Sequence, residues 1–459
     1  MEQITKPHCG ARLDRLPDCR WHSSMFAIVS FGLLVCWSNA VGGLILAQLK
    51  ELGWTDNSTT ATFSAITTAG MFLGALVGGI IGDKTGRRNA FILYEAIHIA
   101  SMVVGAFSPN MDFLIACRFV MGVGLGALLV TLFAGFTEYM PGRNRGTWSS
   151  RVSFIGNWSY PLCSLIAMGL TPLISAEWNW RVQLLIPAIL SLIATALAWR
   201  YFPESPRWLE SRGRYQEAEK VMRSIEEGVI RQTGKPLPPV VIADDGKAPQ
   251  AVPYSALLTG VLLKRVILGS CVLIAMNVVQ YTLINWLPTI FMTQGINLKD
   301  SIVLNTMSMF GAPFGIFIAM LVMDKIPRKT MGVGLLILIA VLGYIYSLQT
   351  SMLLITLIGF FLITFVYMYV CYASAVYVPE IWPTEAKLRG SGLANAVGRI
   401  SGIAAPYAVA VLLSSYGVTG AFILLGAVSI IVAIAIATIG IETKGVSVES
   451  LSIDAVVNK

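Results

Sequence analysis

Apolar runs of about twenty residues or more alternate with short polar turns along the whole 459-residue chain. Each run is long enough to cross a bilayer as a helix. The first, Phe26 to Leu49, is too long for a signal-peptide core and has no small-residue cleavage site. We therefore expect an all-α membrane protein with twelve transmembrane helices, at 26–49, 60–82, 89–108, 112–140, 147–173, 181–202, 265–292, 302–323, 330–349, 352–378, 390–415 and 418–440.

The turns between these runs repeat. Gly82–Arg88 carries an Asp followed four and five residues later by two basic residues, and Met323–Lys329 carries the same spacing. Glu138, with its later Arg145-Gly146, is likewise matched by Glu380 and Arg389-Gly390. Two echoes at one period indicate a duplicated unit, and parallel repeats of helix bundles are typical of transporters. We expect six-helix halves at 1–202 and 264–459, joined by a cytoplasmic linker at 203–263.

Charge assigns the orientation. Only 13% of residues are charged and 55% are hydrophobic, which excludes a soluble protein of this length. The net charge of +8 does not predict a nucleic-acid partner, because Lys and Arg lie between the apolar runs rather than on one domain. Among Lys and Arg, the loops that alternate with the basic turns hold only Lys50, Lys299 and Arg181, so both termini and the linker are expected to be cytoplasmic.

The seven cysteines are scattered and predict neither disulfides nor a zinc site.

The linker divides into two parts. The stretch 213–222 is amphipathic and predicts a helix at the membrane surface. Residues 236–253 contain five prolines and predict an irregular connection rather than a separate soluble domain.

Six motifs in order resemble the major facilitator superfamily. The turn 82–88 resembles that superfamily's loop between helices two and three, and Arg118 with the glycines of 122–126 resembles its fourth-helix pattern. Residues 203–209 and 442–445 resemble the signatures after helices six and twelve of the sugar porters. The acids and Arg-Gly pairs at the cytoplasmic ends, Glu138, Arg145, Glu380 and Arg389, match positions of the same family. The resemblance implies alternating-access transport of a small metabolite.

Two departures from the sugar-porter pattern bear on substrate and coupling. Asn39 stands about where proton-coupled members carry an Asp in helix one. Helix seven, with Gln280, Tyr281, Asn285 and Trp286, lacks the paired glutamines and is closer to the organic-acid branch, as is Arg399 in helix eleven.

Few charged residues lie inside the apolar runs, where a mid-bilayer charge costs about 2.5–3.5 kcal/mol. Arg118 is expected either to couple with a buried acid or to bind an anionic group, and Arg399 either to bind an anion or to satisfy backbone carbonyls. Glu95 and His98, three residues apart on one helical face, are candidates for a proton relay, with interhelical packing as the alternative. Because Asn39 stands where proton-coupled members carry an Asp, uniport and exchange remain alternatives to proton symport.

Substrate contacts are expected from polar and aromatic side chains within apolar helices, because a buried amide or hydroxyl without a partner is costly. The glycines at 122–126 are expected only to let helices approach closely. The candidates for substrate binding are Asn39, Asn157, Gln280, Tyr281, Asn285, Trp286 and Arg399, with Trp158, Tyr369 and Tyr372 as further possibilities.

The charged turns predict a cytoplasmic charge lock that holds the outward-open state, with topology anchoring alone as the alternative. An Asp at such a turn can face the N-terminus of another helix, and the arginines can pair with acids such as Glu138. The residues of this predicted lock are Asp83, Arg87, Arg88, Glu138, Arg145, Asp324, Arg328, Glu380 and Arg389.

The sequence thus predicts a secondary transporter of the inner membrane, not an enzyme, that moves a sugar or sugar acid and is coupled to protons. An organic or aromatic acid is the alternative cargo. A non-transporting sensor is disfavoured by the short tails, and a channel by the lack of a filter or charge ring. We expect no cofactor and no metal. The expected partners are the substrate, protons and the lipid bilayer, with the protein a monomer.

Overall fold

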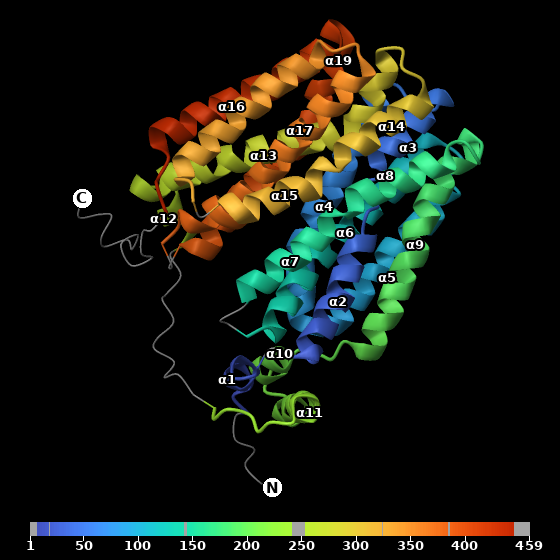
Figure 1. Ribbon diagram of the computed structural model, residues 1–459. Coiled ribbons are helices and arrows are strands. Elements are labelled where there is room, and N and C mark those ends of the chain that lie inside the picture. Colours follow the sequence, from blue (N-terminus) through green and yellow to red (C-terminus); the bar gives the residue numbers. More distant parts are fainter. Residues whose placement is uncertain are drawn as a thin grey trace. The chain divides into compact units, whose positions relative to one another are not determined.

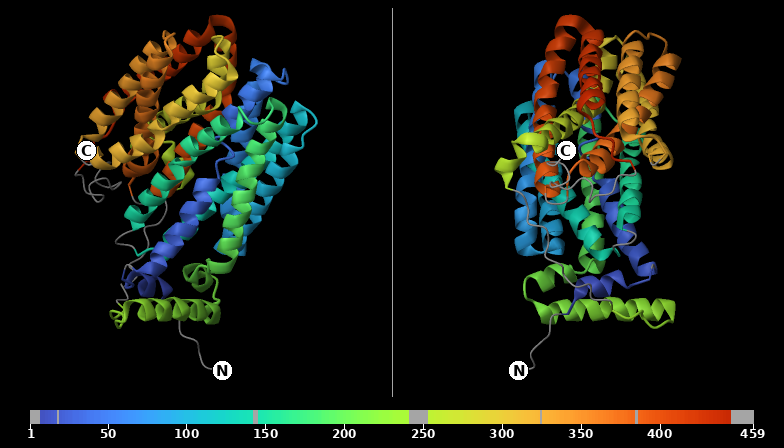
Figure 2. Two further views of the ribbon diagram at one scale, coloured as in Figure 1. Left: turned by 45° about the vertical axis from the view of Figure 1, so that its right-hand side comes forward. Right: turned by 90° about the vertical axis from the view of Figure 1, so that its left-hand side faces the viewer.

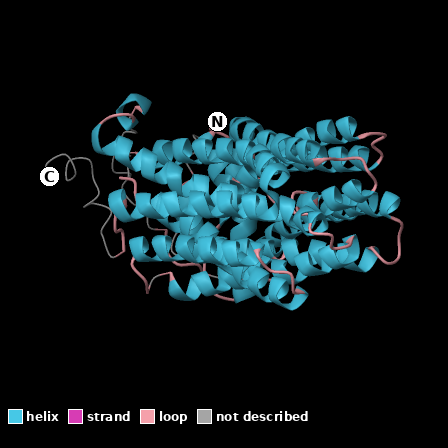
Figure 3. Ribbon diagram, turned by 90° about the horizontal axis from the view of Figure 1, so that it is seen from above, coloured by secondary structure: helices cyan, strands magenta, loops and turns pink. Residues whose placement is uncertain are grey.

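The computed structural model describes residues 7–17, 19–141, 145–240, 253–323, 325–383 and 386–444. Throughout these ranges the chain forms helices and loops without a β-strand (Figures 1 and 3), which confirms the all-α class. The elements are α1 (Cys9–Asp14), α2 (Arg20–Val35), α3 (Gly42–Glu51), α4 (Asn57–Thr85), α5 (Arg87–Ala106), α6 (Met111–Tyr139), α7 (Arg145–Asn157), α8 (Ser159–Leu170), α9 (Ala176–Tyr201), α10 (Pro206–Ser211), α11 (Tyr215–Thr233), α12 (Tyr254–Leu257), α13 (Gly260–Thr293), α14 (Leu298–Met309), α15 (Gly311–Val322), α16 (Arg328–Ser347), α17 (Met352–Cys371), the π-helix η1 (Tyr372–Tyr377), α18 (Val378–Glu380) and α19 (Lys387–Ile439).

Nine stretches of the described chain are long and apolar enough to cross a membrane. The nine do not include α2–α3 and α7–α8, which are each broken, and they count α19 once. Gly417 within α19 has φ 64° and ψ −159°, so this element is two helices meeting at a kink. Counting α2–α3, α7–α8 and the part of α19 after Gly417 as three further spanning segments, the described helices correspond to the twelve predicted runs.

The breaks within predicted helices have local causes. Pro161 lacks the N–H that would bond to the carbonyl of Asn157, and α7 ends at Asn157. Pro313 has the same relation to Met309, the last residue of α14. The break between α2 and α3 holds no proline. Its centre is Ser38-Asn39, two residues whose side chains compete for backbone hydrogen bonds.

By packing, the chain forms two compact units. Unit 1 comprises Met1–Asn39, Gly70–Ser159 and Leu184–Gly246, and unit 2 comprises Ala40–Ala69, Tyr160–Gln183 and Lys247–Lys459. Unit 2 therefore contains two first-half segments, 40–69 and 160–183, together with the whole of the second half. The halves 1–202 and 264–459 with the linker 203–263 are defined by sequence duplication and stay a prediction.

Unit 1 has an aromatic core and a helical platform. Tyr139 and Phe202 are buried edge-to-face with ring centroids 5.0 Å apart. Helix α11 lies across the ends of α2 and α9 (Figure 2) and confirms the helix predicted at 213–222, which extends further than expected. Arg12 of α1 bridges to Glu226 of α11 at 2.7 Å. Burial raises the pKa of Glu226, but hydrogen bonds from Arg12 and Arg15 outweigh it and hold that pKa below its usual value.

Unit 2 is organised around α13. This helix packs along α19 and also against α3 from the first half. Trp286 of α13 is fully buried, and Arg265, buried at its other end, donates to the carbonyl of Ile381 at 2.9 Å.

Candidate functional site

A buried polar cluster joins the break of the first transmembrane helix to α5 in unit 1. Glu95 and His98 are both fully buried, and His98 Nδ1 lies 3.4 Å from a carboxylate oxygen of Glu95. His98 Nε2 lies 2.7 Å from the hydroxyl of Ser38. Cys36 Sγ donates to the other oxygen of Glu95 at 3.7 Å. The predicted pairing of Glu95 with His98 is therefore present, and two residues from another helix complete it.

Two features of α6 hold this cluster in place. Gly124 faces His98 so closely that a Cβ there would lie 3.0 Å from the His98 backbone nitrogen, which confirms the packing role expected of that glycine run. Arg118 is buried, and its Nη1 donates at 2.7 Å to the carbonyl of Ser38, which the helix break has released. This contact ties Arg118 to the cluster.

The cluster can hold one more proton, or one fewer, without leaving a polar atom unmatched. In one state, His98 Nδ1–H donates to the Glu95 carboxylate and the Ser38 hydroxyl donates to Nε2. In the other, both ring nitrogens carry protons, and Nε2–H donates to Ser38 after its hydroxyl has turned. The serine hydroxyl thus acts as donor or acceptor, which suits a site that gains and loses a proton.

The same residues also satisfy the spacing of a metal site. Cys36 Sγ, a Glu95 oxygen and a His98 nitrogen lie within 4.8 Å of one another. Each of these three groups also has a hydrogen-bond partner within the cluster.

The predicted helix-seven residues lie in α13 of unit 2. Tyr281, Asn285 and Trp286 are buried and Gln280 is half-buried. Trp286 Nε1 is buried without a hydrogen-bond partner among the described residues. Gly402 of α19 packs against the ring of Tyr281, so the eleventh helix approaches α13 at this level. These side chains offer neutral donors and acceptors and no charge.

The other predicted substrate residues are more scattered. Asn157 donates to the carbonyl of Ser153 in its own helix at 2.7 Å, and Asn39 is half-buried in the break after α2. Arg399 is half-buried and forms no hydrogen bond or ion pair with any described residue. The three further possibilities separate: Trp158 is 36% exposed, Tyr369 donates to the carbonyl of Val272, and Tyr372 stacks on Tyr377.

Four polar residues of unit 2 were not predicted. Gln48 of α3 is fully buried, and neither atom of its amide has a partner among the described residues. Asn305 donates to Ser164 at 3.2 Å but leaves its own oxygen unmatched. Tyr160 and Tyr367 pack edge-to-face at 5.3 Å with their hydroxyls beside Gln280. Gln48 and Asn305 stand near the ends of apolar runs, where a polar residue is easily taken for an interfacial one.

The charged turn of unit 1 forms a knot of side chains. Arg87 bonds Glu138 through Nε at 2.9 Å and Asp83 through Nη1 at 2.7 Å. Glu204 accepts from the backbone N–H groups of Arg87 and Arg88 at 2.7 and 3.3 Å. A carboxylate at the start of α5 is favoured by the free N–H groups and the dipole of that helix.

Unit 2 repeats this knot. Arg328 bonds Glu380 at 3.0 Å, and Glu442 accepts from the N–H groups of Arg328 and Lys329 at 2.7 and 3.1 Å. Burial raises the pKa of Glu442, but the three backbone N–H groups that it accepts outweigh burial and hold that pKa below its usual value. The residues at the helix starts, Glu204 and Glu442, belong to the signatures 203–209 and 442–445 but were not predicted as part of the knots.

The side chains of the other described lock residues bond elsewhere. Arg88 donates to the carbonyl of Trp199, and Arg389 lies over the ring of Tyr254. Arg145 begins α7, but its side chain is outside the described part of the chain, as is Asp324.

Comparison with known proteins places the chain in a family. The pattern of the Major Facilitator Superfamily matches residues 26–406. The chain is 99% identical to the protein named "Putative metabolite transport protein YdjK" of Escherichia coli (strain K12), over 100% of both chains. It is 44% identical to the inner membrane metabolite transport protein YdjE of the same organism, over 98% of this chain and 99% of that one.

Among solved structures, the inward-open conformation of the xylose transporter XylE from E. coli aligns with a TM-score of 0.74. The match covers 94% of this chain and 99% of that one at 17% identity, so it supports the fold alone. The predicted fold is confirmed, and the relatives are transport proteins rather than enzymes. The chain is an integral membrane transporter of small metabolites and belongs to the Major Facilitator Superfamily.

Proposed function

We propose that this transporter moves a sugar or sugar acid across the inner membrane by alternating access, with proton coupling at the Glu95–His98 cluster. Both termini and the linker lie in the cytoplasm in this proposal. The main support for this substrate class is the set of neutral polar side chains buried in unit 2. Among them, Gln48, Trp286 and Asn305 have polar atoms without a hydrogen-bond partner among the described residues.

Chemistry favours a polyhydroxylated substrate at these groups. Each unmatched buried donor or acceptor costs about 1–3 kcal/mol, and a sugar presents several hydroxyls that both donate and accept. Gln280, beside the hydroxyls of Tyr160 and Tyr367, adds an amide with the same versatility. The ring pair Tyr160–Tyr367 gives the apolar face of a pyranose a surface to lie against.

A substrate screen tests this proposal. Purified protein is heated with neutral sugars, sugar acids, and aromatic or aliphatic acids, and a ligand at 100 times its Kd should add about 2.7 kcal/mol to the folded state. We expect neutral sugars to raise Tm. Gln280→Ala should weaken their binding about tenfold, the effect of losing about 1.4 kcal/mol of hydrogen bonding. Ser414→Ala, a change outside the proposed groups, is the control variant.

Arg399 supports the alternative function, transport of an organic acid. It is a cation without a partner among the described residues, in a helix packed on α13, and its guanidinium is suited to a carboxylate. If only anions raise Tm, and Arg399→Gln loses that effect while Gln280→Ala keeps it, the protein is an organic-acid transporter instead. If sugar acids raise Tm and both Arg399→Gln and Gln280→Ala lose this effect, the substrate is a sugar acid.

We further propose that the two knots form the predicted charge lock. Asp83 at the end of α4 pairs with Arg87 at the start of α5 and its side chain is 64% exposed, so within unit 1 this surface ion pair contributes only about 0.5 kcal/mol. Asp83→Asn should therefore leave Tm and substrate binding nearly unchanged while lowering the transport rate several-fold. Lys84→Gln, the neighbouring exposed residue, is the control. Equal transport by Asp83→Asn and wild type at equal expression would remove Asp83 from the lock.

A further inference from the structure

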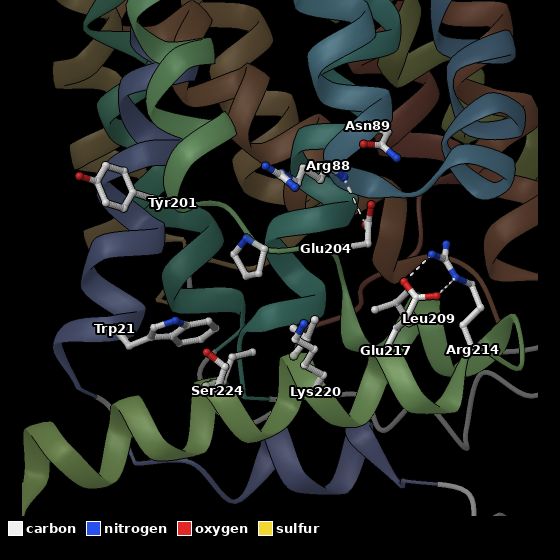
Figure 4. A pocket seen from close by; sticks show the side chains of 13 residues that line it. Trp21, Arg88, Asn89, Tyr201, Glu204, Leu209, Arg214, Glu217, Lys220 and Ser224 are labelled. Carbon is white, nitrogen blue, oxygen red and sulfur yellow. Dashed lines mark hydrogen bonds and ion pairs between the residues drawn. The ribbon is translucent and has the colours of Figure 1, made fainter. Parts of the chain in front are cut away.

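Beneath the helix ends of unit 1 lies a cavity of about 670 Å³ for which the transport proposal names no ligand. Helix α11 forms its floor, and the first turn of α5, the end of α9 and the start of α2 form its walls (Figure 4). Lys220 and Ser224 rise from α11 toward these helix ends, with Trp21 on one side and Arg88 above.

The charges lining this cavity do not cancel. Both of its acids are already matched: Glu204 accepts from three backbone N–H groups, and Glu217 binds Arg214 through two bonds of 2.5 and 2.7 Å. Lys220 has no hydrogen bond or ion pair with any described residue, so its three N–H donors are unused by the protein. The Nε of Arg88 is buried and likewise lacks a partner in the described chain.

The unused ammonium of Lys220 and the guanidinium of Arg88, which already donates to the carbonyl of Trp199, are groups of the kind that binds a phosphate oxygen. Ammonium and guanidinium groups form their strongest hydrogen bonds with anionic oxygens. The amide of Asn89 and the hydroxyl of Ser224 add neutral polar groups to the same lining. A phosphate group is therefore a better match to this cavity than a neutral sugar.

The rest of the lining is apolar. Trp21, Leu209 and Ile225 border the cavity, and Tyr201 at its edge is 60% exposed. On the same face of α9 as Tyr201, one and two turns farther along, Leu197 and Ile193 are 37 and 47% exposed. A ligand with a phosphate and a hydrocarbon part could place its phosphate at Lys220 and its chains along this flank of α9, which faces lipid in a membrane.

We propose that this cavity binds a phosphate group, with Lys220 and Arg88 as its cationic contacts, and that the phosphate belongs to an anionic phospholipid. The bound lipid would join α11 to the ends of α5 and α9 and would make the platform part of the membrane-facing surface. A soluble phosphate monoester also presents anionic phosphate oxygens and is separated from the lipid by experiment.

Native mass spectrometry of the full-length protein in detergent tests the lipid. Phosphatidylglycerol is titrated, with phosphatidylcholine as the zwitterionic comparison. We expect one phosphatidylglycerol to bind more tightly than the others, and Lys220→Gln to weaken that binding about fivefold. Lys220→Arg should retain it. Arg231→Gln removes the same charge from the exposed last turn of α11, outside the cavity, and should leave binding unchanged.

A second arm uses glycerol 3-phosphate and inorganic phosphate in a thermal-shift assay with the same variants. A shift that Lys220→Gln abolishes, without preferential lipid binding, would keep the phosphate site and assign it to a soluble ligand. If Lys220→Gln and Arg231→Gln behave alike in both arms, the cavity is a solvated basic surface and the proposal is wrong. Lys220 is exposed at the protein surface, so loss of folding does not confuse these outcomes.

Discussion

Glu95→Gln is expected to abolish proton-driven accumulation of the substrate while leaving substrate exchange across the membrane intact. With one proton moved per substrate, a gradient of one pH unit supports about tenfold accumulation, since each pH unit stores about 1.4 kcal/mol. The substituted amide keeps the shape of the side chain but cannot form the anion that stabilises a doubly protonated His98. The accumulation ratio in proteoliposomes should therefore fall to about one.

The partners of Glu95 provide companion variants. His98→Gln should behave like Glu95→Gln, because the proton then has no imidazole to occupy. Ser38→Ala removes the hydroxyl that turns between donor and acceptor and should reduce coupling without abolishing exchange. Glu51→Gln changes an exposed carboxylate on α3 and serves as the control.

The outcomes separate coupling from packing. Measurements are made with a chelator present throughout, so that a bound metal ion cannot produce the pH dependence. Proton-driven accumulation by Glu95→Gln at the wild-type level would show that this cluster only packs helices together. Equal loss of accumulation and exchange, with a lowered Tm, would mean that the variant has damaged the fold, and Ser38→Ala then decides the matter.

Gly43→Leu is expected to lower the transport rate at least tenfold while preserving substrate binding. Gly43 of α3 packs directly on α13: a Cβ there would lie 2.4 Å from the carbonyl oxygen of Ile284 and 3.0 Å from that of Asn285. Backbone atoms cannot rotate away as a side chain can, so the two helices must separate. Overpacking of this kind costs about 1–3 kcal/mol, and about 1.4 kcal/mol already shifts a two-state population tenfold.

The effect should have a direction. The contact between α3 and α13 joins a first-half to a second-half helix, toward the end of α13 opposite Arg265 and its partner Ile381. With the proposed cytoplasmic orientation of the charged turns, loss of this contact favours a protein open to the outside. Substrate should then bind in right-side-out vesicles and not in inside-out ones. Gly169→Leu is the control, because nothing lies within 4 Å of a Cβ at this helical, exposed glycine. Equal transport by the two variants would show that α3 need not close on α13.

The repeated local patterns were predictable from the sequence. The twelve runs, the pairing of Arg87 with Glu138 and of Arg328 with Glu380, and the contact between Glu95 and His98 all follow from spacing along helices or from duplication. Each of these features needs only the residues of neighbouring turns or the comparison of one half with the other.

What the sequence did not predict depends on contacts between distant segments. Glu204 reaches the start of α5 from 117 positions away, and no local pattern marks that carboxylate as its cap. The break at Ser38 is hidden by the apolar residues on both sides, which satisfy a hydropathy window whether or not the helix is continuous. Gln48 became notable only when its amide proved to be buried and unmatched.

The two knots impose an order on biosynthesis. The first knot draws on Arg87, Glu138 and Glu204, so it can close once the chain has been made as far as Glu204, before α13 exists. The segments 40–69 and 160–183 group in unit 2 with residues 247–459, so much of their packing awaits residues that are translated later. A newly made first half can therefore form its charged knot before the second half is translated, while the segments 40–69 and 160–183 still lack many of their final packing partners.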